Sequence, residues 1–109
     1  MNKQYKVTLS KIAAQSISEI TRYISYDLMS PKAAANLARL IRKEITNLSY
    51  MPQRIRLISE EPWHSRGVHQ MIVKNYYIYF LIIEEQCMVE ILDVTYARQD
   101  QKKQLERIP

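Results

Sequence analysis

Two kinds of side chain in this sequence could do chemistry on an anionic substrate: a histidine in a strand-like segment, and a set of cationic residues. His69 lies within residues 67–73, GVHQMIV, and its imidazole can exchange a proton near neutral pH. Tyr96 and Arg98 follow the last apolar segment, where a guanidinium can anchor a phosphate. Acid–base chemistry at a phosphate ester needs a group that transfers a proton and a cation beside the phosphate. These three residues are therefore the candidate catalytic group.

Further cations could form a rim that binds a nucleic acid or another target. They are Arg54, Arg56, Arg66 and Lys74. Each candidate has a structural alternative. His69 could be a strand histidine that is hydrogen-bonded at the sheet surface, and Arg98 could pair with a carboxylate such as Asp100. The loop arginines could be solvated surface.

Composition limits the other classes of function. The 109 residues carry a net charge of +5, which favours an anionic partner, and they are enough for one domain over residues 1–109. A single cysteine, Cys87, fits a reducing compartment. No apolar run approaches the roughly 18 residues that span a bilayer, so we expect a cytoplasmic protein with no membrane contact. One glycine and two histidines predict no phosphate-binding glycine loop, metal site or cofactor.

The first half of the chain predicts one strand followed by two helices. Apolar and polar residues alternate over residues 5–9, as in a half-buried strand. Ser10 is placed to cap a helix whose apolar residues recur every three or four positions up to Leu28. Ser30 and Pro31 predict a second helix start, and Pro52 ends that helix. So short a connection predicts an antiparallel helical hairpin.

The second half predicts a loop and then three antiparallel strands. Residues 51–66 show neither period and contain Trp63, which would either stack on a partner or plug the loop onto the core. Three segments rich in β-branched and aromatic residues follow, and residues 98–107 could form a short final helix. The order β-α-α-β-β-β-(α) predicts an α+β fold: a twisted, antiparallel-dominated sheet with the hairpin on one face and the other face free to bind.

This element order resembles the RelE/ParE superfamily of toxins. The resemblance covers essentially the whole chain and is strongest in three late segments: residues 67–71 (GVHQM), 75–80 (NYYIYF) and 96–100 (YARQD). They are similar to the family's succession of a glycine with a basic residue, an aromatic-rich strand, and an aromatic residue followed by Arg-x-Asp. The entry to the second helix, residues 30–34, is also common in that family.

The resemblance implies a growth-arresting toxin that is neutralised by a small, acidic cognate antitoxin. RelE-like members cut messenger RNA on the ribosome, whereas ParE-like members inhibit DNA gyrase. Residues 68–72 lack the lysines that RelE-like enzymes use, and Tyr77 occupies the position of one of their arginines. We therefore expect a ParE-like, gyrase-directed toxin in which Tyr77 contributes to target binding. An mRNA interferase that uses His69, Tyr96 and Arg98 is the first alternative, and a non-toxic binding module is the second.

Overall fold

The structure is a computed structural model that describes residues 3–98. Its elements, in chain order, are β1 (Lys6–Leu9), α1 (Lys11–Arg22) with a π-helical extension (Tyr23–Asp27), α2 (Pro31–Thr46), β2 (His69–Val73), β3 (Tyr76–Ile83) and β4 (Met88–Tyr96). Short 3₁₀ turns lie at Asn47–Ser49, Pro52–Arg54 and Glu84–Gln86. This order confirms the predicted succession of strands and helices. Apart from Arg98, the final helix expected at residues 98–107 lies outside the described residues.

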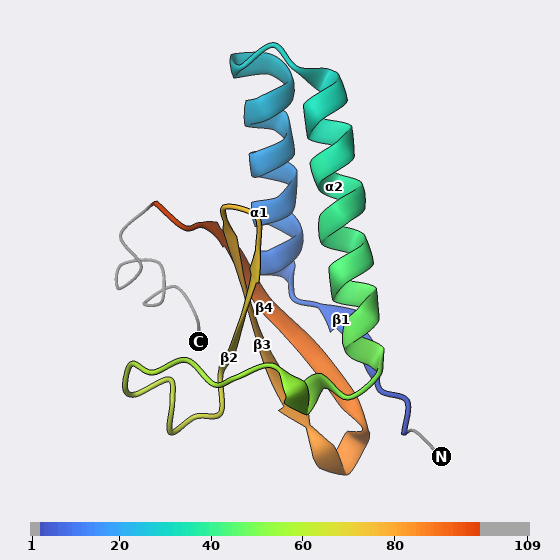
Figure 1. Ribbon diagram of the computed structural model, residues 1–109, viewed down its shortest axis with the longest axis vertical. Helices are drawn as coiled ribbons and strands as arrows, with labels where there is room; N and C mark the ends of the chain where they lie inside the picture. Colours follow the sequence, from blue (N-terminus) through green and yellow to red (C-terminus); the bar gives the residue numbers. More distant parts are fainter. Residues whose placement is uncertain (1–2, 99–109) are drawn as a thin grey trace.

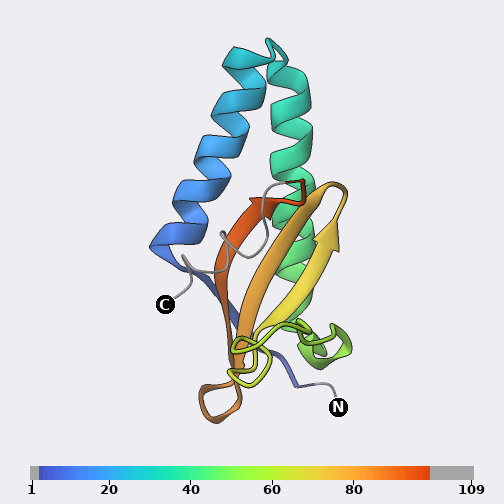
Figure 2. The same ribbon diagram turned by 90° about the vertical axis from the view of Figure 1, so that its left-hand side faces the viewer.

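The four strands form one mixed sheet in the order β1-β4-β3-β2. The pairs β2–β3 and β3–β4 are antiparallel, as the meander predicts, while β1 pairs with β4 in parallel. The helical hairpin covers one face of this sheet and projects beyond its end (Figures 1 and 2). The predicted α+β class and the placement of the hairpin are therefore confirmed.

The two helices begin in different ways although each follows a serine. At α1, the Ser10 hydroxyl oxygen accepts a hydrogen bond from the Ala13 backbone N–H at 3.0 Å, and the hydroxyl donates to the Leu92 carbonyl at 2.9 Å. Ser10 thus caps the helix and ties it to β4. The cap expected from Ser30 was wrong, because its side chain makes no capping bond. Pro31 still opens α2, since proline at the first helical position needs no hydrogen-bond partner for its nitrogen.

The main core lies between the hairpin and the sheet. Its buried residues come from both helices, from the turn after α2 and from β2, β3 and β4, and they include Ala13, Ile41, Leu48, Met71, Ile78, Phe80, Val89 and Ile91. Val7 of β1 packs against this core. The alternation of side chains along β3 places Ile78 and Phe80 on the hairpin side of the sheet.

The other face of the sheet is not free, contrary to the prediction. Ile58, Trp63 and Val68 from the loop pack there against Tyr79 and Leu92. The exposed fraction of Trp63 is 9%, so the tryptophan plugs the loop onto the sheet and is not a stacking platform. The sequence interpretation missed this cover because residues 51–66 show no period that would reveal their buried side.

A polar cluster joins the N-terminal segment to the turn between β3 and β4. The Tyr5 hydroxyl donates to Glu84 Oε1 at 2.6 Å, and Gln53 Nε2 donates to the Tyr5 oxygen at 2.6 Å. The hydrogen bond from Tyr5 is the main cause that lowers the pKa of the Glu84 carboxyl.

Within residues 3–98, no helix has the length and apolar character needed to cross a bilayer.

The first prediction concerns the two helix starts. We expect Ser10→Ala to lower the free energy of unfolding by about 1–2 kcal/mol, because it removes a cap and a tether to β4. Ser30→Ala is the matched control, and its effect should stay within about 0.5 kcal/mol. Urea unfolding followed by circular dichroism measures both. Equal losses in the two variants would contradict the assigned role of Ser10.

The second prediction concerns acid stability. Because folding lowers the pKa of Glu84 from 4.5, the unfolded state takes up the proton more readily. The stabilisation by ionised Glu84 is thus complete above pH 4.5 and is lost as the pH falls through the lower, folded-state pKa. Glu84→Gln should flatten the dependence of stability on pH in this window. Glu85→Gln, at the neighbouring exposed carboxylate, is the control, and an equal flattening there would refute the assignment.

Candidate functional site

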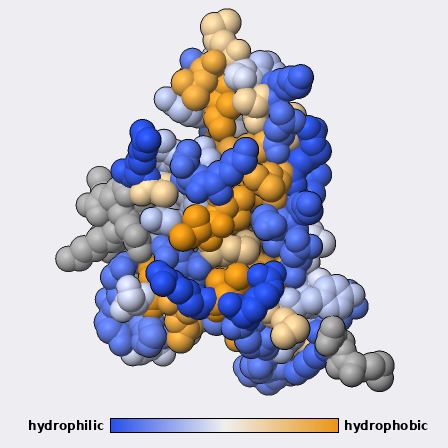
Figure 3. Space-filling model, viewed as in Figure 1, coloured by the Kyte–Doolittle hydropathy of each residue, from blue (hydrophilic) through white to orange (hydrophobic). Residues whose placement is uncertain are grey.

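A groove separates the underside of the hairpin from the end of the sheet. It has a volume of about 670 Å³. The residues that line it come from α1 and the segment that follows it up to Leu28, from the β2–β3 turn and the start of β3, and from the end of β4: Ser16, Glu19, Ile20, Tyr23, Ile24, Leu28, Asn75, Tyr76, Val94, Thr95 and Tyr96. Figure 3 shows a band of hydrophobic residues that runs down this face from the hairpin towards the sheet. Such an open, mostly apolar groove suits a peptide segment better than a small polar substrate.

Two tyrosines form the sheet side of the groove. Tyr76 and Tyr96 are opposite each other on β3 and β4, and their ring centroids are 5.4 Å apart. Burial, with a smaller effect from the Tyr96 phenol, raises the pKa of Tyr76 above 10.0. Like any phenol, the Tyr76 hydroxyl can donate a hydrogen bond to a ligand in the groove.

A buried polar pair lies where α1 crosses β4. The Ser16 hydroxyl donates to Asp93 Oδ1 at 2.6 Å, and this oxygen also accepts the Val94 backbone N–H at 2.8 Å. Asp93 is fully buried, and its Oδ2 has no hydrogen-bond partner within the part of the chain that the structure describes. Since a half-satisfied buried carboxylate depends on each remaining bond, this pair fixes the position of α1 on β4.

His69 lies at the first residue of β2, on the hairpin side of the sheet. Its ring stacks on Phe80, with centroids 4.9 Å apart and planes only 9° from parallel. The Ile55 carbonyl oxygen is 2.7 Å from Nδ1, and because a carbonyl can only accept, Nδ1 carries the proton. The half-buried ring is therefore held on one face and at one nitrogen, which leaves Nε2 for any proton transfer.

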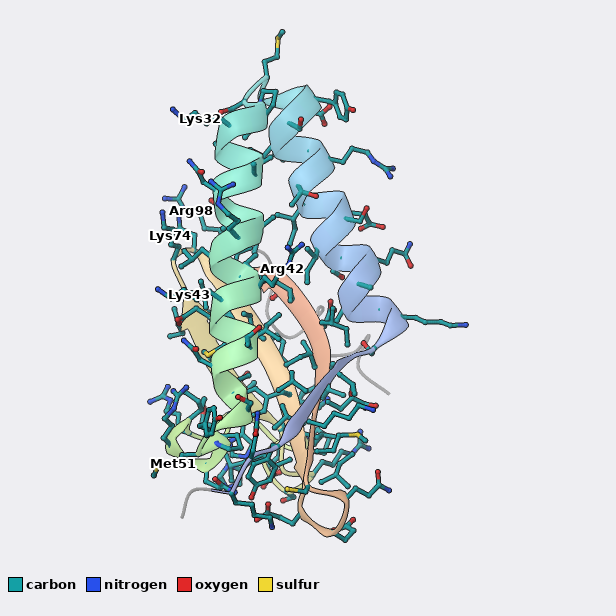
Figure 4. All side chains as sticks on the ribbon, turned by 90° about the vertical axis from the view of Figure 1, so that its right-hand side faces the viewer. Lys32, Arg42, Lys43, Met51, Lys74 and Arg98 are labelled. Carbon is teal, nitrogen blue, oxygen red and sulfur yellow. The ribbon has the colours of Figure 1, made fainter. Side chains whose placement is uncertain are left out.

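At the opposite end of the sheet from His69 lie Tyr96, Arg98 and Lys74. Lys74 is the first residue of the β2–β3 turn, and the Ala97 N–H donates to the carbonyl of Asn75 in the same turn at 2.7 Å. Both cationic side chains are exposed, and they project on the same side of the molecule in Figure 4. This end of the sheet therefore carries two cations close to Tyr96, one of the tyrosines that line the groove.

The remaining predicted binding residues are divided between two further places. Arg54 and Arg56 flank Ile55, so their backbone lies beside the start of β2, and their side chains are exposed. Arg66 is exposed in the loop that covers the rear face of the sheet. Tyr77 is half-buried on that rear face, where its ring lies edge-on to Tyr79 at 6.2 Å.

The structure does not bring His69, Tyr96 and Arg98 together. In the strand register, His69 pairs with Phe80 while Tyr96 pairs with Tyr76, four residues away along β3. At about 3.4 Å a residue, this offset alone corresponds to roughly 14 Å. The roles predicted for these residues stay predictions. Within residues 3–98, no cluster of three His, Cys, Asp or Glu side chains could hold a metal.

Comparison with known proteins identifies the family. The sequence model described as the ParE toxin of the type II toxin–antitoxin system, parDE, matches residues 7–101. The chain belongs to the ParE toxin family. A search of characterised protein sequences found no match.

The solved structures of several other proteins have a fold similar to that of this chain. The chromosomal ParDE system of P. aeruginosa gives a TM-score of 0.72 at 15% identity, covering 88% of this toxin and 99% of that chain. A RelBE toxin–antitoxin complex from Mycobacterium tuberculosis gives 0.60 at 20% identity, with 89% and 94% covered. The isolated E. coli RelE toxin gives 0.58 at 12% identity, with 94% and 97% covered. The toxin therefore shares one fold with members of both branches.

Sequence reasoning missed two features of this ParE-family toxin. The groove was not predicted, because Glu19 and Tyr23 are on one helix and Tyr76 and Tyr96 are in distant strands. Their proximity depends on how the hairpin crosses the sheet. The cations on the outer face of α2 were also overlooked, although their helical spacing was visible in the sequence.

Proposed function

We propose that this protein is a growth-arresting toxin that acts on DNA gyrase and is neutralised by a cognate antitoxin. The observation that carries the proposal is the ParE family match over residues 7–101. The geometry supports the same branch, because His69 lies apart from Tyr96 and Arg98 along the sheet. A proton-transfer residue and a phosphate anchor must both reach the same phosphodiester if they are to cleave RNA.

A second candidate is an mRNA interferase of the RelE type. One observation favours it: His69 has a fixed ring, a proton assigned to Nδ1, and the backbone of Arg54 and Arg56 alongside. Such an imidazole can act as an acid or a base on a phosphodiester when cations are brought beside the phosphate.

For the antitoxin, the groove is the binding site we propose. It exposes large apolar side chains, including Tyr23 at 54% and Leu28 at 56%, on a surface rimmed by polar residues. Such a groove suits an amphipathic helix that inserts its apolar side. The antitoxin is proposed to be small and acidic overall, because the toxin carries a net charge of +5.

The third prediction separates the two targets. Induced expression should arrest growth, leave cellular mRNA uncut in primer-extension maps, and impair supercoiling of a reporter plasmid. Arg98→Ala should relieve the arrest while circular dichroism shows an intact fold, since Arg98 is exposed and outside the core. Lys11→Ala, another exposed cation, is the control and should remain toxic. Cuts in translated messages with normal supercoiling would assign the protein to the interferase branch.

The fourth prediction tests the antitoxin groove with two neighbouring exposed residues. Leu28→Asp places a charge in the groove, so we expect affinity for the antitoxin to fall at least about tenfold, as for loss of a buried interface contact. Met29→Asp adds the same charge at a residue that does not line the groove, and affinity should change little. Calorimetry with the purified antitoxin measures both. Equal affinities in the two variants would exclude this groove as the antitoxin site.

A further inference from the structure

The outer face of α2 carries a straight row of cations, here called the α2 stripe: Lys32, Arg39 and Lys43. They are seven and four residues apart, and all three are exposed. These spacings correspond to nearly whole helical turns, so the three side chains leave the helix on one line. The buried residues of α2, which include Ala34, Ile41 and Ile45, occupy the opposite side. The stripe therefore points away from the core and from the sheet.

The charge of this helix is strongly one-sided. The helix Pro31–Thr46 contains a single carboxylate, Glu44, and four cations: Lys32, Arg39, Arg42 and Lys43. Its net charge is therefore +3. Arg39 donates a hydrogen bond to the amide oxygen of Asn36, a neutral acceptor that leaves its charge uncompensated. Figure 4 shows Lys32 and Lys43 along the same side of the view as Lys74 and Arg98 at the strand ends.

The residue types in the α2 stripe favour one class of anionic partner over the others. Asn36 and Thr46 continue the row between and beyond the cations, so it contains no apolar side chain. Stable protein interfaces have an apolar or aromatic centre, which this surface lacks. Single-stranded nucleic acids are held by stacking of their bases on aromatic rings, and the stripe offers none. What remains is recognition of a regular array of phosphates.

We propose that the α2 stripe binds the phosphate backbone of double-stranded DNA. With a rise of about 1.5 Å per residue, its cations are roughly 10 Å and 6 Å apart, which places several phosphates of a duplex within reach. A helix of about 10–12 Å diameter also matches the roughly 12 Å width of the major groove of B-DNA. The deep, narrow major groove of A-form RNA would not admit it.

This proposal goes beyond the action on gyrase and does not require it. The stripe residues are absent from the lining of the groove proposed for the antitoxin, and they include none of the predicted catalytic residues. The two surfaces can therefore be tested separately, and a failure of one proposal leaves the other standing.

The fifth prediction uses fluorescence anisotropy with a labelled 20-base-pair DNA duplex and the full-length protein. The test variant is Lys32→Glu, Arg39→Glu and Lys43→Glu together. The control variant is Lys6→Glu, Lys11→Glu and Arg22→Glu, three exposed cations on β1 and α1. Each triple changes the charge by six, from +5 to −1, so the two variants are matched in net charge. Circular dichroism and thermal unfolding establish that both variants are folded.

We expect the wild type to bind the duplex with a strong dependence on salt. Each phosphate contact adds about 0.9 to the slope of log affinity against log salt, so the α2 variant should lose about 3 from that slope. Its affinity at low salt should fall at least tenfold further than that of the control variant. This contrast would support the stripe as the site.

Four results would overturn the proposal. The first is no binding by the wild type at low salt, and the second is an equal loss in both triple variants, which would reflect net charge alone. The third is tighter binding to the single strand or to an RNA duplex of the same sequence. The fourth is binding of a polyglutamate peptide that displaces the DNA with higher affinity, which would make the stripe a protein-binding surface.

Discussion

The fold depends on β4, the last strand of the meander, which also pairs with the first strand of the chain. β4 is hydrogen-bonded to β1 on one side and to β3 on the other, and α1 packs on it. Ser10 reinforces this arrangement, because its N–H donates to Ile91 and its hydroxyl donates to Leu92. The start of the helical hairpin is thus fixed by residues about eighty positions later in the chain. The groove between the hairpin and the sheet exists only because this long-range pairing sets where α1 crosses.

An irregularity in β4 lets one strand serve both faces of the sheet. Tyr79 pairs with Asp93 while Phe80 pairs with Ile91, so Leu92 is an extra residue between them. As a result, Ile91 and Val94 both contribute to the core under the hairpin, although strict alternation would place them on opposite faces. Leu92 is then free to join Trp63 and Tyr79 on the rear face. The loop can cover that face because the bulge supplies an apolar residue there.

Local patterns in the sequence predict the helices and strands well, but they do not predict the contacts between elements that are distant in the sequence. The periods of two and of three to four residues gave the order and class of the fold. The same serine-before-helix signal was right at Ser10 and wrong at Ser30, because Ser10 also finds an acceptor on β4. Turn signals were weak as well: Met29, Met51, Lys74 and Cys87 adopt left-handed conformations without glycine. No local sequence pattern predicts the parallel pairing of β1 with β4, the bulge in β4 or the covered rear face of the sheet.

The candidate site residues show the same difference between what local sequence patterns predict and what only the fold determines. A sequence can nominate His69, Tyr96 and Arg98 by residue type, but only the strand register shows that they lie at different ends of the sheet. Surfaces on one helix are easier to find, because helical spacing alone defines the α2 stripe. Since that stripe and the groove use different residues, an antitoxin in the groove would leave the cations of α2 exposed. Under these two proposals, neutralisation of the toxin and attraction to DNA would be separable, because each would use its own surface.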